Sequence, residues 1–205
     1  MICAIDGGLA YHTRTLREPP FNQYFDRLID LRTLGDVDLS RENVLLIPCR
    51  TNGQRLQPHR RELARFVDRG GLLVVFGETH PQLFLDGVEF TREPTNYWWW
   101  LDPAADLGVR VNGPEHPLVS SLSIDDISWH VHGTLRLQGA SHSLIEWRHP
   151  ERGGSVMETQ TRGEGELVIT TLDPIYHHGS GFMPATTRFL SQFLPALNEY
   201  ARLRG

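Results

Sequence analysis

Polar and titratable residues follow four short apolar runs of this sequence, at the point where each run ends. They are Asp6 after the first run, Arg50, Thr51 and Asn52 after the second, Glu78, Thr79 and His80 after the third, and Asp173, His177 and His178 after the last. Carboxylates and imidazoles gathered in one place can act as general acids and bases. An arginine beside them can orient an anionic or hydroxyl-rich ligand.

The apolar runs themselves predict how these residues are positioned. Val44–Ile47 and Leu72–Phe76 are short and rich in β-branched residues, as buried parallel strands are, and one helix-length segment separates them. In open α/β sheets, ligands bind at the carboxyl ends of such strands. We therefore expect one crevice there. The catalytic candidates are Glu78, His80, Asp173 and His177, and the ligand-binding candidates are Asp6, Arg50, Thr51, Asn52, Thr79, His178 and Trp99. The alternative is that these loops are simply solvated, with Asp6 or Asp173 capping a turn.

Further elements are expected along the chain from apolar spacing and turn residues. A strand at Ile2–Ile5 opens the chain, and helical spacing predicts a helix over Phe21–Ile29, one after Pro58 and one after Pro184. A short strand is expected at Leu31–Leu34. Later strands are expected at Ile127–Leu137, Ser143–Arg148, Ser155–Gln160 and Glu166–Leu172, with a hairpin turn over Thr161–Gly165.

A histidine pair is the one pattern that suggests a metal. His130 and His132 alternate along an expected strand, so both would point to the same face. Such a pair can chelate a metal if a third ligand arrives, and Asp125–Asp126 lies just upstream. No HExxH or CxxC motif supports this, and strand histidines without a metal are commoner. No cofactor is predicted.

Tyr97–Leu101 contains three consecutive tryptophans, within a segment of about residues 81–117 where periodicity fades and an insertion or lid is expected. Strand-like alternation would put Trp98 and Trp100 on one face and Trp99 on the other. The indoles could cover the sheet as part of the core, form an interface with a partner protein or a second copy, or stack on a sugar-like ligand, with Trp99 as the candidate.

Composition excludes several classes of function. The chain has 205 residues and a formal net charge of −5, which does not favour nucleic acid, and all twenty basic residues are arginine. A lysine Schiff base and a P-loop lysine are therefore excluded. Two cysteines do not form a disulfide framework. No apolar run approaches a membrane span and no signal segment is apparent at Met1, so a cytoplasmic location without membrane contact is expected.

Three segments of the sequence resemble segments of a known family. They are the residues from Leu63 to Gly77, from Glu115 to Leu122 and from Gly163 to Pro174, followed by a C-terminal helix. In this order they resemble the class I glutamine amidotransferase-like superfamily, and more closely its ThuA-like, trehalose-utilisation-type branch. The resemblance implies a single α/β domain over residues 1–205. Its fold would be a flavodoxin-like three-layer sandwich with a mostly parallel central sheet and a β-rich insertion after the fourth strand.

The sequence departs from that family at its catalytic residues. True amidotransferases carry a cysteine after the strand matching Leu72–Phe76, and here Thr79 stands at or next to that position. Asp173 and Ile175 replace the family's histidine and glutamate. Cys49 is the remaining candidate thiol, and a packing role is favoured for it. We therefore expect no amidotransferase activity, but binding of a small polar ligand, possibly sugar-like in chemistry, or of a partner protein. The alternative is a ThuA-like enzyme that acts on a sugar derivative by acid/base chemistry.

Overall fold

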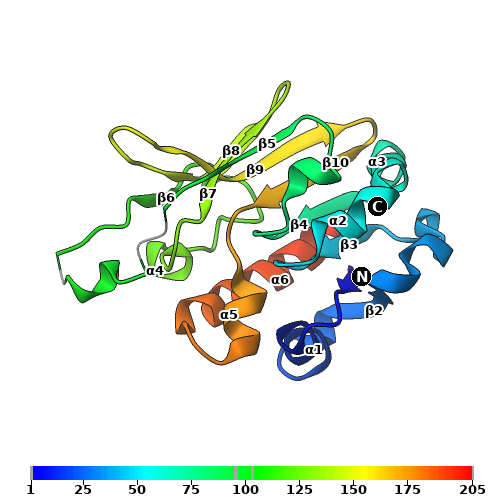
Figure 1. Cartoon of the computed structure of the whole chain (residues 1–205), viewed down its shortest axis with the longest axis horizontal. Helices are drawn as coiled ribbons and strands as arrows, with labels where there is room; N and C mark the ends of the chain where they lie inside the picture. Colours follow the sequence, from blue (N-terminus) through cyan, green and yellow to red (C-terminus); the bar gives the residue numbers. More distant parts are fainter. Residues whose placement is uncertain (1, 95–96, 103, 205) are drawn as a thin grey trace.

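A computed structural model describes residues 2–94, 97–102 and 104–204, in which ten strands form one sheet accompanied by six α-helices (Figure 1). The strands are β1 (Ile2–Asp6), β2 (Phe25–Asp30), β3 (Val44–Ile47), β4 (Leu72–Val75), β5 (Val88–Arg92), β6 (Val109–Val111), β7 (Gly133–Leu137), β8 (His142–Trp147), β9 (Gly154–Arg162) and β10 (Gly165–Thr170). The helices are α1 (Ala10–Arg17), α2 (Gly53–Leu56), α3 (Arg60–Asp68), α4 (Ile124–Ile127), α5 (Pro174–Ser180) and α6 (Pro184–Arg204).

One half of the sheet is parallel and carries the predicted crevice. Its strands lie in the order β2-β1-β3-β4-β10, and each neighbouring pair is parallel. Every residue of β1, β3, β4 and β10 is buried, which explains their nearly continuous apolar character. The prediction that these four strands run side by side in the same direction is confirmed.

Helices cover both faces of this parallel half, because successive side chains of a strand point to opposite faces. On one face, Leu46 and Val74 belong to the core that includes Phe189 and Phe193 of α6. On the other face, the alternate residues of β3 and β4 pack in a second core with the apolar stripe of α3, which contains Leu63, Phe66 and Val67. The parallel half therefore consists of three layers.

The other half of the sheet is antiparallel. Strands β9, β7 and β5 continue from β10, and β8 pairs with β9 and β6 with β8, all in antiparallel register. The hairpin turn predicted before Gly165 joins β9 to β10, with Gly163 at a φ of 57°. A mostly parallel, flavodoxin-like sheet is thus not confirmed, and the architecture is mixed α/β. The predicted insertion of residues 81–117 contributes β5 and β6, and its role as a lid stays a prediction.

Several predicted elements near the N-terminus are wrong. The helix expected over Phe21–Ile29 is replaced by β2, an edge strand paired with β1, because strand pairing outweighs helical apolar spacing here. The strand expected at Leu31–Leu34 is a 3-10 helix, Leu31–Asp36, whose period of about three residues buries Leu31 and Leu34 together. Helix α1 was not predicted.

Two further predictions need correction closer to the crevice. The strand expected over Ile127–Leu137 begins only at Gly133, because Ser123 and Asp126 form a capping box that makes Ile124–Ile127 helical. The loop expected after Asp173 forms α5, in which Pro174 occupies the first turn. Helix α5 packs against α1, where the backbone of Tyr11 lies so close to Gly179 that no side chain fits. Among the described residues, no helix combines the length and the apolar character needed to cross a membrane.

Candidate functional site

The turns after β3, β4 and β10 are tied together by backbone hydrogen bonds centred on Gly77. Its N–H donates to the carbonyl of Leu172 at 2.9 Å, and its carbonyl accepts from the N–H of Arg50 at 3.0 Å. A Cβ at Gly77 would lie 2.1 Å from the carbonyl oxygen of Thr171, so only glycine permits this approach. The glycine therefore sets the distance between the loops that carry Arg50, Glu78 and Asp173.

An ion pair between Arg50 and Glu78 lies at this carboxyl edge. The Nη2 of Arg50 is 2.7 Å from Oε2 of Glu78 and 3.5 Å from Oδ2 of Asp173. The guanidinium also stacks on Tyr176, with its carbon 3.3 Å from the ring centroid. Burial disfavours the charged arginine, but Glu78 and Asp173 outweigh this and raise the pKa of Arg50. The arginine is therefore a fixed positive charge.

The backbone around this ion pair is in the left-handed region. Arg50, Glu78 and His80 have φ values of 62°, 57° and 54°, and among the described non-glycine residues only Met183 joins them. This conformation costs an L-residue roughly 1–2 kcal/mol. Strain of this kind concentrates at active sites and ligand-binding loops, where the surrounding structure maintains it.

Asp173 lies completely buried behind the ion pair, at the centre of a polar cluster. Its Oδ1 accepts a hydrogen bond from Nε1 of Trp129 at 3.0 Å and lies 3.3 Å from Nε2 of His132 and 3.2 Å from Nε2 of His177. Burial raises the pKa of Asp173, but His132 and His177 outweigh burial and hold it well below its usual range. Asp173 precedes α5, yet its side chain makes no capping hydrogen bond. The carboxylate is directed to the histidines.

His132 links the buried carboxylate to Glu78. Its Nδ1 lies 3.6 Å from Oε1 of Glu78, while its Nε2 faces Asp173. Burial lowers the pKa of His132, but Asp173 and Glu78 outweigh burial and raise it. His130 lies next to this group, with ring centroids 5.8 Å from His132 and 5.3 Å from His177. Burial, followed by the neighbouring His177, lowers the pKa of His130 to about 4.

The cluster contains most of the buried side-chain polar atoms that lack a hydrogen-bond partner among the described residues. They are Nε of Arg50, Oε2 of Glu78, Oγ1 of Thr79, Nδ1 of His130, Nε2 of His132, Oδ2 of Asp173 and both ring nitrogens of His177, with Glu158 and Thr171 supplying the remainder. Two of these atoms, Oε2 of Glu78 and Oδ2 of Asp173, lie within ion-pair distance of Arg50. Atoms without any partner are rare in folded proteins because an unpaired buried donor or acceptor costs about 1–3 kcal/mol. Their concentration makes this cluster the strongest candidate site among the described residues.

A crevice of about 500 Å³ opens directly outside the ion pair. Five of the predicted site residues line it: Arg50, Thr51, Asn52, Glu78 and His80. The Arg50 and Glu78 side chains remain 32% and 28% exposed, so they stand between the crevice and the buried cluster. His80 and Asn52 are exposed, and Thr79 is buried beneath them. The structure thus brings Glu78, Asp173 and His177 into one cluster with Arg50, and places His80 on the crevice.

Three predicted site residues are engaged elsewhere. Asp6 accepts from the N–H of Gly8 and pairs with Arg17 at 2.8 Å, the turn-capping alternative considered for it. His178 contacts the hydroxyl of Thr187 through Nδ1 at 2.9 Å, on α6. Trp99 donates from Nε1 to the carbonyl of Trp129 at 2.6 Å, and it lines a separate hollow of about 420 Å³.

The aromatic segment is only partly buried. Trp99 lies in a 3-10 helix, Trp99–Leu101, rather than in an alternating strand. Tyr97 and Trp98 are 51% and 66% exposed, so these two side chains do not form core. Of the three roles expected for this segment, a contact with a partner protein or a second copy and the stacking of Trp99 on a sugar-like ligand both stay predictions. Nothing is described of residues 95, 96 and 103, which belong to the expected insertion.

The predicted third metal ligand is misplaced. Asp126 is bound by Ser123, just before α4, and by Arg188 and Gln192 of α6. Asp125 is exposed, and neither aspartate belongs to the cluster of possible metal ligands found among the described residues. His132 is joined instead by Asp173 and His177. Sequence reasoning also missed Trp129 and Tyr176. Trp129, which donates to Asp173, was expected on the strand face opposite His130. Tyr176, which stacks under Arg50, lies on α5, a helix that was not predicted.

Cys49 serves packing, as expected. It is fully buried, and its Sγ accepts from the N–H of Tyr176 at 3.1 Å. Burial, and then the charge of Asp173, raises the pKa of its thiol well above the ordinary value. A neutral thiol without solvent contact is a poor nucleophile.

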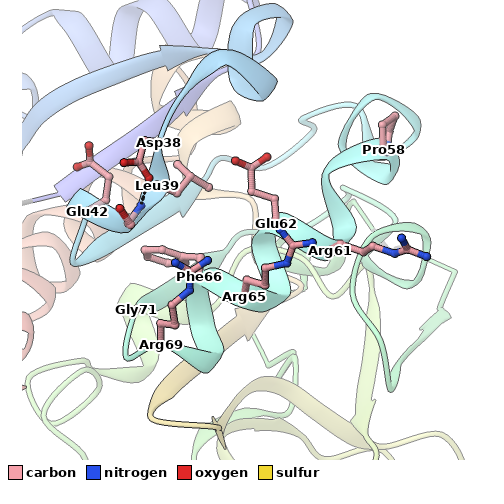
Figure 2. A pocket seen from close by; sticks show the side chains of 11 residues that line it. Asp38, Leu39, Glu42, Pro58, Arg61, Glu62, Arg65, Phe66, Arg69 and Gly71 are labelled. Atoms are coloured by element: carbon pink, nitrogen blue, oxygen red, sulfur yellow. Dashed lines mark hydrogen bonds between the residues drawn. The ribbon is translucent and has the colours of Figure 1, made fainter.

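A larger hollow of about 540 Å³ lies on the opposite edge of the sheet, where β3 and β4 begin (Figure 2). Arg61 and Arg65 of α3 and Arg69 just after it surround it with Asp38 and Glu42. The charged side chains that line it are exposed or half-buried and carry both signs. It lacks the unpaired buried atoms of the crevice, which therefore remains the stronger candidate.

The comparisons with known proteins show the fold. No protein-family model and no curated protein matches the sequence. The cytoplasmic protein STM1381 of Salmonella typhimurium LT2 aligns with a TM-score of 0.59 at 11% identity, over 98% of this chain and 98% of that chain. A β-galactosidase from Bacillus circulans sp. alkalophilus aligns with a TM-score of 0.51 at 13% identity, over 97% of this chain but 30% of that one.

One further match bears on the predicted branch. A ThuA-like protein from Bacteroides uniformis aligns with a TM-score of 0.47 at 13% identity, over 94% of this chain and 89% of that chain. Membership of the ThuA-like branch and the link to glutamine amidotransferases stay predictions. At these identities the likeness shows that the chain has a mixed α/β fold shared with solved proteins, and its function must be argued from the site.

Proposed function

We propose that the crevice outside Arg50 and Glu78 binds a small polar ligand and that the chain has no glutamine amidotransferase activity. The observation that carries the proposal is the strained ion pair itself. Two non-glycine residues in left-handed backbone hold a guanidinium and a carboxylate 2.7 Å apart on the wall of a 500 Å³ crevice. Strained backbone of this kind is typical of binding and active sites, and a merely solvated loop would have no reason to keep it.

The chemistry of the crevice defines the ligand class. The partly exposed guanidinium of Arg50 offers N–H donors to the crevice, and the partly exposed carboxylate of Glu78 offers acceptors. A ligand that presents both acceptors and donors close together satisfies this pair, as a sugar, a sugar acid or a hydroxy acid does. The crevice volume suits a molecule of about the size of a monosaccharide derivative.

The missing nucleophile supports the second half of the proposal. The sequence has two cysteines, and both are buried, Cys3 inside β1 and Cys49 against α5. By the resemblance, Thr79 stands at or next to the position of the family's catalytic cysteine. The charge of Asp173 helps to raise the pKa of Cys49, so this buried thiol is kept neutral rather than activated.

Ligand binding is tested by calorimetric titration of the full chain with a panel of sugars, sugar acids and hydroxy acids. Glu78→Gln and Arg50→Gln should each weaken the best ligand about 10- to 100-fold, the effect of losing a charged hydrogen bond worth about 1.5–3 kcal/mol. Glu89→Gln, an exposed carboxylate on β5, is the matched control and should bind as the wild type does. If no compound binds, or if Glu78→Gln and Glu89→Gln bind alike, the binding proposal fails. Glutaminase activity abolished by Cys49→Ser would overturn the second half.

A second candidate function is an acid/base enzyme acting on a sugar derivative. The observation in its favour is the chain of groups behind the crevice, in which His132 lies 3.6 Å from Glu78 and 3.3 Å from Asp173. This arrangement could exchange a proton between Glu78 on the crevice and the buried carboxylate of Asp173. Turnover of a keto- or phospho-sugar, lowered about 10²- to 10⁴-fold by Glu78→Gln, would support it. Binding without turnover across that panel would leave the chain a binding protein.

A further inference from the structure

We propose that His132, Asp173 and His177 bind a divalent transition-metal ion of the zinc type beside the crevice. One ligand atom from each of the three lies within 4.8 Å of the others, and all three residues are buried. They come from three parts of the chain, the segment before β7, the turn after β10 and helix α5. The inference adds an ion to the site of the proposed function and rests on that function only for the claim that the ion lies beside the bound ligand.

The distances fit shared coordination. Zinc binds imidazole nitrogen and carboxylate oxygen at about 2.0–2.1 Å, so two tetrahedral ligands lie about 3.3 Å apart. Nε2 of His132 and Nε2 of His177 lie 3.3 and 3.2 Å from Oδ1 of Asp173. Two imidazoles and one carboxylate, with a fourth position open, make up the ligand set of a catalytic zinc site.

Hydrogen bonding between these side chains does not account for the arrangement. Oδ1 of Asp173 already accepts from Trp129, and neither Nε2 has a hydrogen bond of acceptable geometry. Oδ2 of Asp173 makes no hydrogen bond and has the Nη2 of Arg50 at 3.5 Å. Both Nε2 atoms lack a hydrogen bond, and all three side chains are more than nine-tenths buried, with one ligand atom of each within 4.8 Å of the others. A cation among these atoms would bind the imidazole lone pairs that are otherwise unused.

The surrounding groups match what a metal ligand needs. A ligating histidine usually has a carboxylate or carbonyl next to its other ring nitrogen, which fixes its orientation. Oε1 of Glu78 lies 3.6 Å from Nδ1 of His132 and occupies that position. The charge also fits. Asp173, Glu78 and Arg50 sum to a formal −1 with neutral imidazoles (−1 −1 +1), so a divalent ion meets a negative site. Nitrogen ligands select zinc, copper, nickel or iron over magnesium and calcium.

The test is metal binding by the full-length chain, stripped with a chelator and titrated with Zn²⁺. Calorimetry and elemental analysis after dialysis should give one ion per chain. His132→Ala and His177→Ala should each weaken binding by more than about 100-fold, since loss of a supporting group alone costs 10- to 100-fold. His142→Ala, an exposed histidine on β8, is the matched control and should keep the ion. Circular dichroism monitors folding of each variant.

A spectroscopic measurement on the wild type keeps the test independent of variant folding. Co²⁺ in place of Zn²⁺ should give visible absorption of a four- or five-coordinate site with nitrogen ligands. Absence of a stoichiometric ion, or its retention in His132→Ala and His177→Ala, overturns the metal site. The proposed function is separable. Arg50→Gln, which leaves the three proposed ligands and Glu78 in place, should retain the ion and lose ligand affinity. Ligand binding without any ion would refute only the metal inference, and an ion without any ligand would refute only the proposed function.

Discussion

Replacing Glu78 by glycine should make the protein more stable than replacing it by alanine. Both substitutions remove the carboxylate and its ion pair with Arg50, so the comparison isolates the backbone. At a φ of 57°, alanine keeps the left-handed strain and glycine releases it. The free energy of unfolding should therefore be larger for Glu78→Gly than for Glu78→Ala.

The magnitude follows from two opposing terms. The left-handed conformation costs an L-residue roughly 1–2 kcal/mol, and glycine avoids this cost. Glycine also gives the unfolded chain more freedom, which takes back about 0.4–1 kcal/mol. The expected net gain of Glu78→Gly over Glu78→Ala is about 1 kcal/mol, or about 2–4 °C in Tm for a chain of this size.

Urea denaturation monitored by circular dichroism measures the difference. Ala64, exposed on helix α3, provides the control, because Ala64→Gly should destabilise by about 1 kcal/mol and so have the opposite sign. Both Glu78 variants should lose ligand affinity. Equal stability of Glu78→Gly and Glu78→Ala, with Ala64→Gly behaving as expected, would refute the claim that strain is maintained at Glu78.

Three further outcomes are expected. Gly77→Ala should cost about 3 kcal/mol or more, because its Cβ would meet the Thr171 backbone at 2.1 Å, and a loss below about 1 kcal/mol in denaturation would contradict this. Burial raises the pKa of Asp126, but hydrogen bonds from Ser123 and neighbours lower it overall. Its stabilisation is therefore present above the unfolded value and lost as pH falls below about 4, so Asp126→Asn should reduce the acid sensitivity of Tm, and an unchanged pH profile would argue against it. Cys3, whose pKa burial raises to about 12, and Cys49 should resist a thiol reagent in the native protein and both react after unfolding. Rapid native labelling would show an accessible thiol.

The predicted crevice could be anticipated because parallel strands impose strong rules on sequence. The buried runs of β3 and β4 are apolar on both faces, and the polar residues that follow them must emerge at one edge. Arg50, Glu78 and Asp173 were grouped from this rule alone. Asp6 obeys the same rule, yet a local turn and Arg17 engage its carboxylate, which strand order cannot reveal.

Other errors arose where the local pattern was ambiguous. Phe21–Ile29 has helical apolar spacing, but residues 25–30 form a strand because they pair with β1. This pairing is a long-range interaction, and the local sequence does not indicate it. The polar stretch after Asp173 resembled a loop because its apolar residues are few, and α5 forms through contacts with α1. The antiparallel half of the sheet likewise depends on pairing between distant segments.

The sequence alone determined which chemistry is available: carboxylates, imidazoles and an arginine at strand ends, with two cysteines and no lysine in the chain. Tertiary structure decided which of them meet. His132 precedes β7, whereas Asp173 and His177 follow β10, and the two strands are brought near each other because both pair with β9. Gly77 in addition ties the turn after β10 to the turn that carries Glu78. The spacing of residues along the chain predicts local secondary structure. A buried site, in contrast, combines side chains from segments that are distant in the sequence. Only the folded chain shows that, of His130 and His132, it is His132 that lies in a buried cluster with Asp173 and His177.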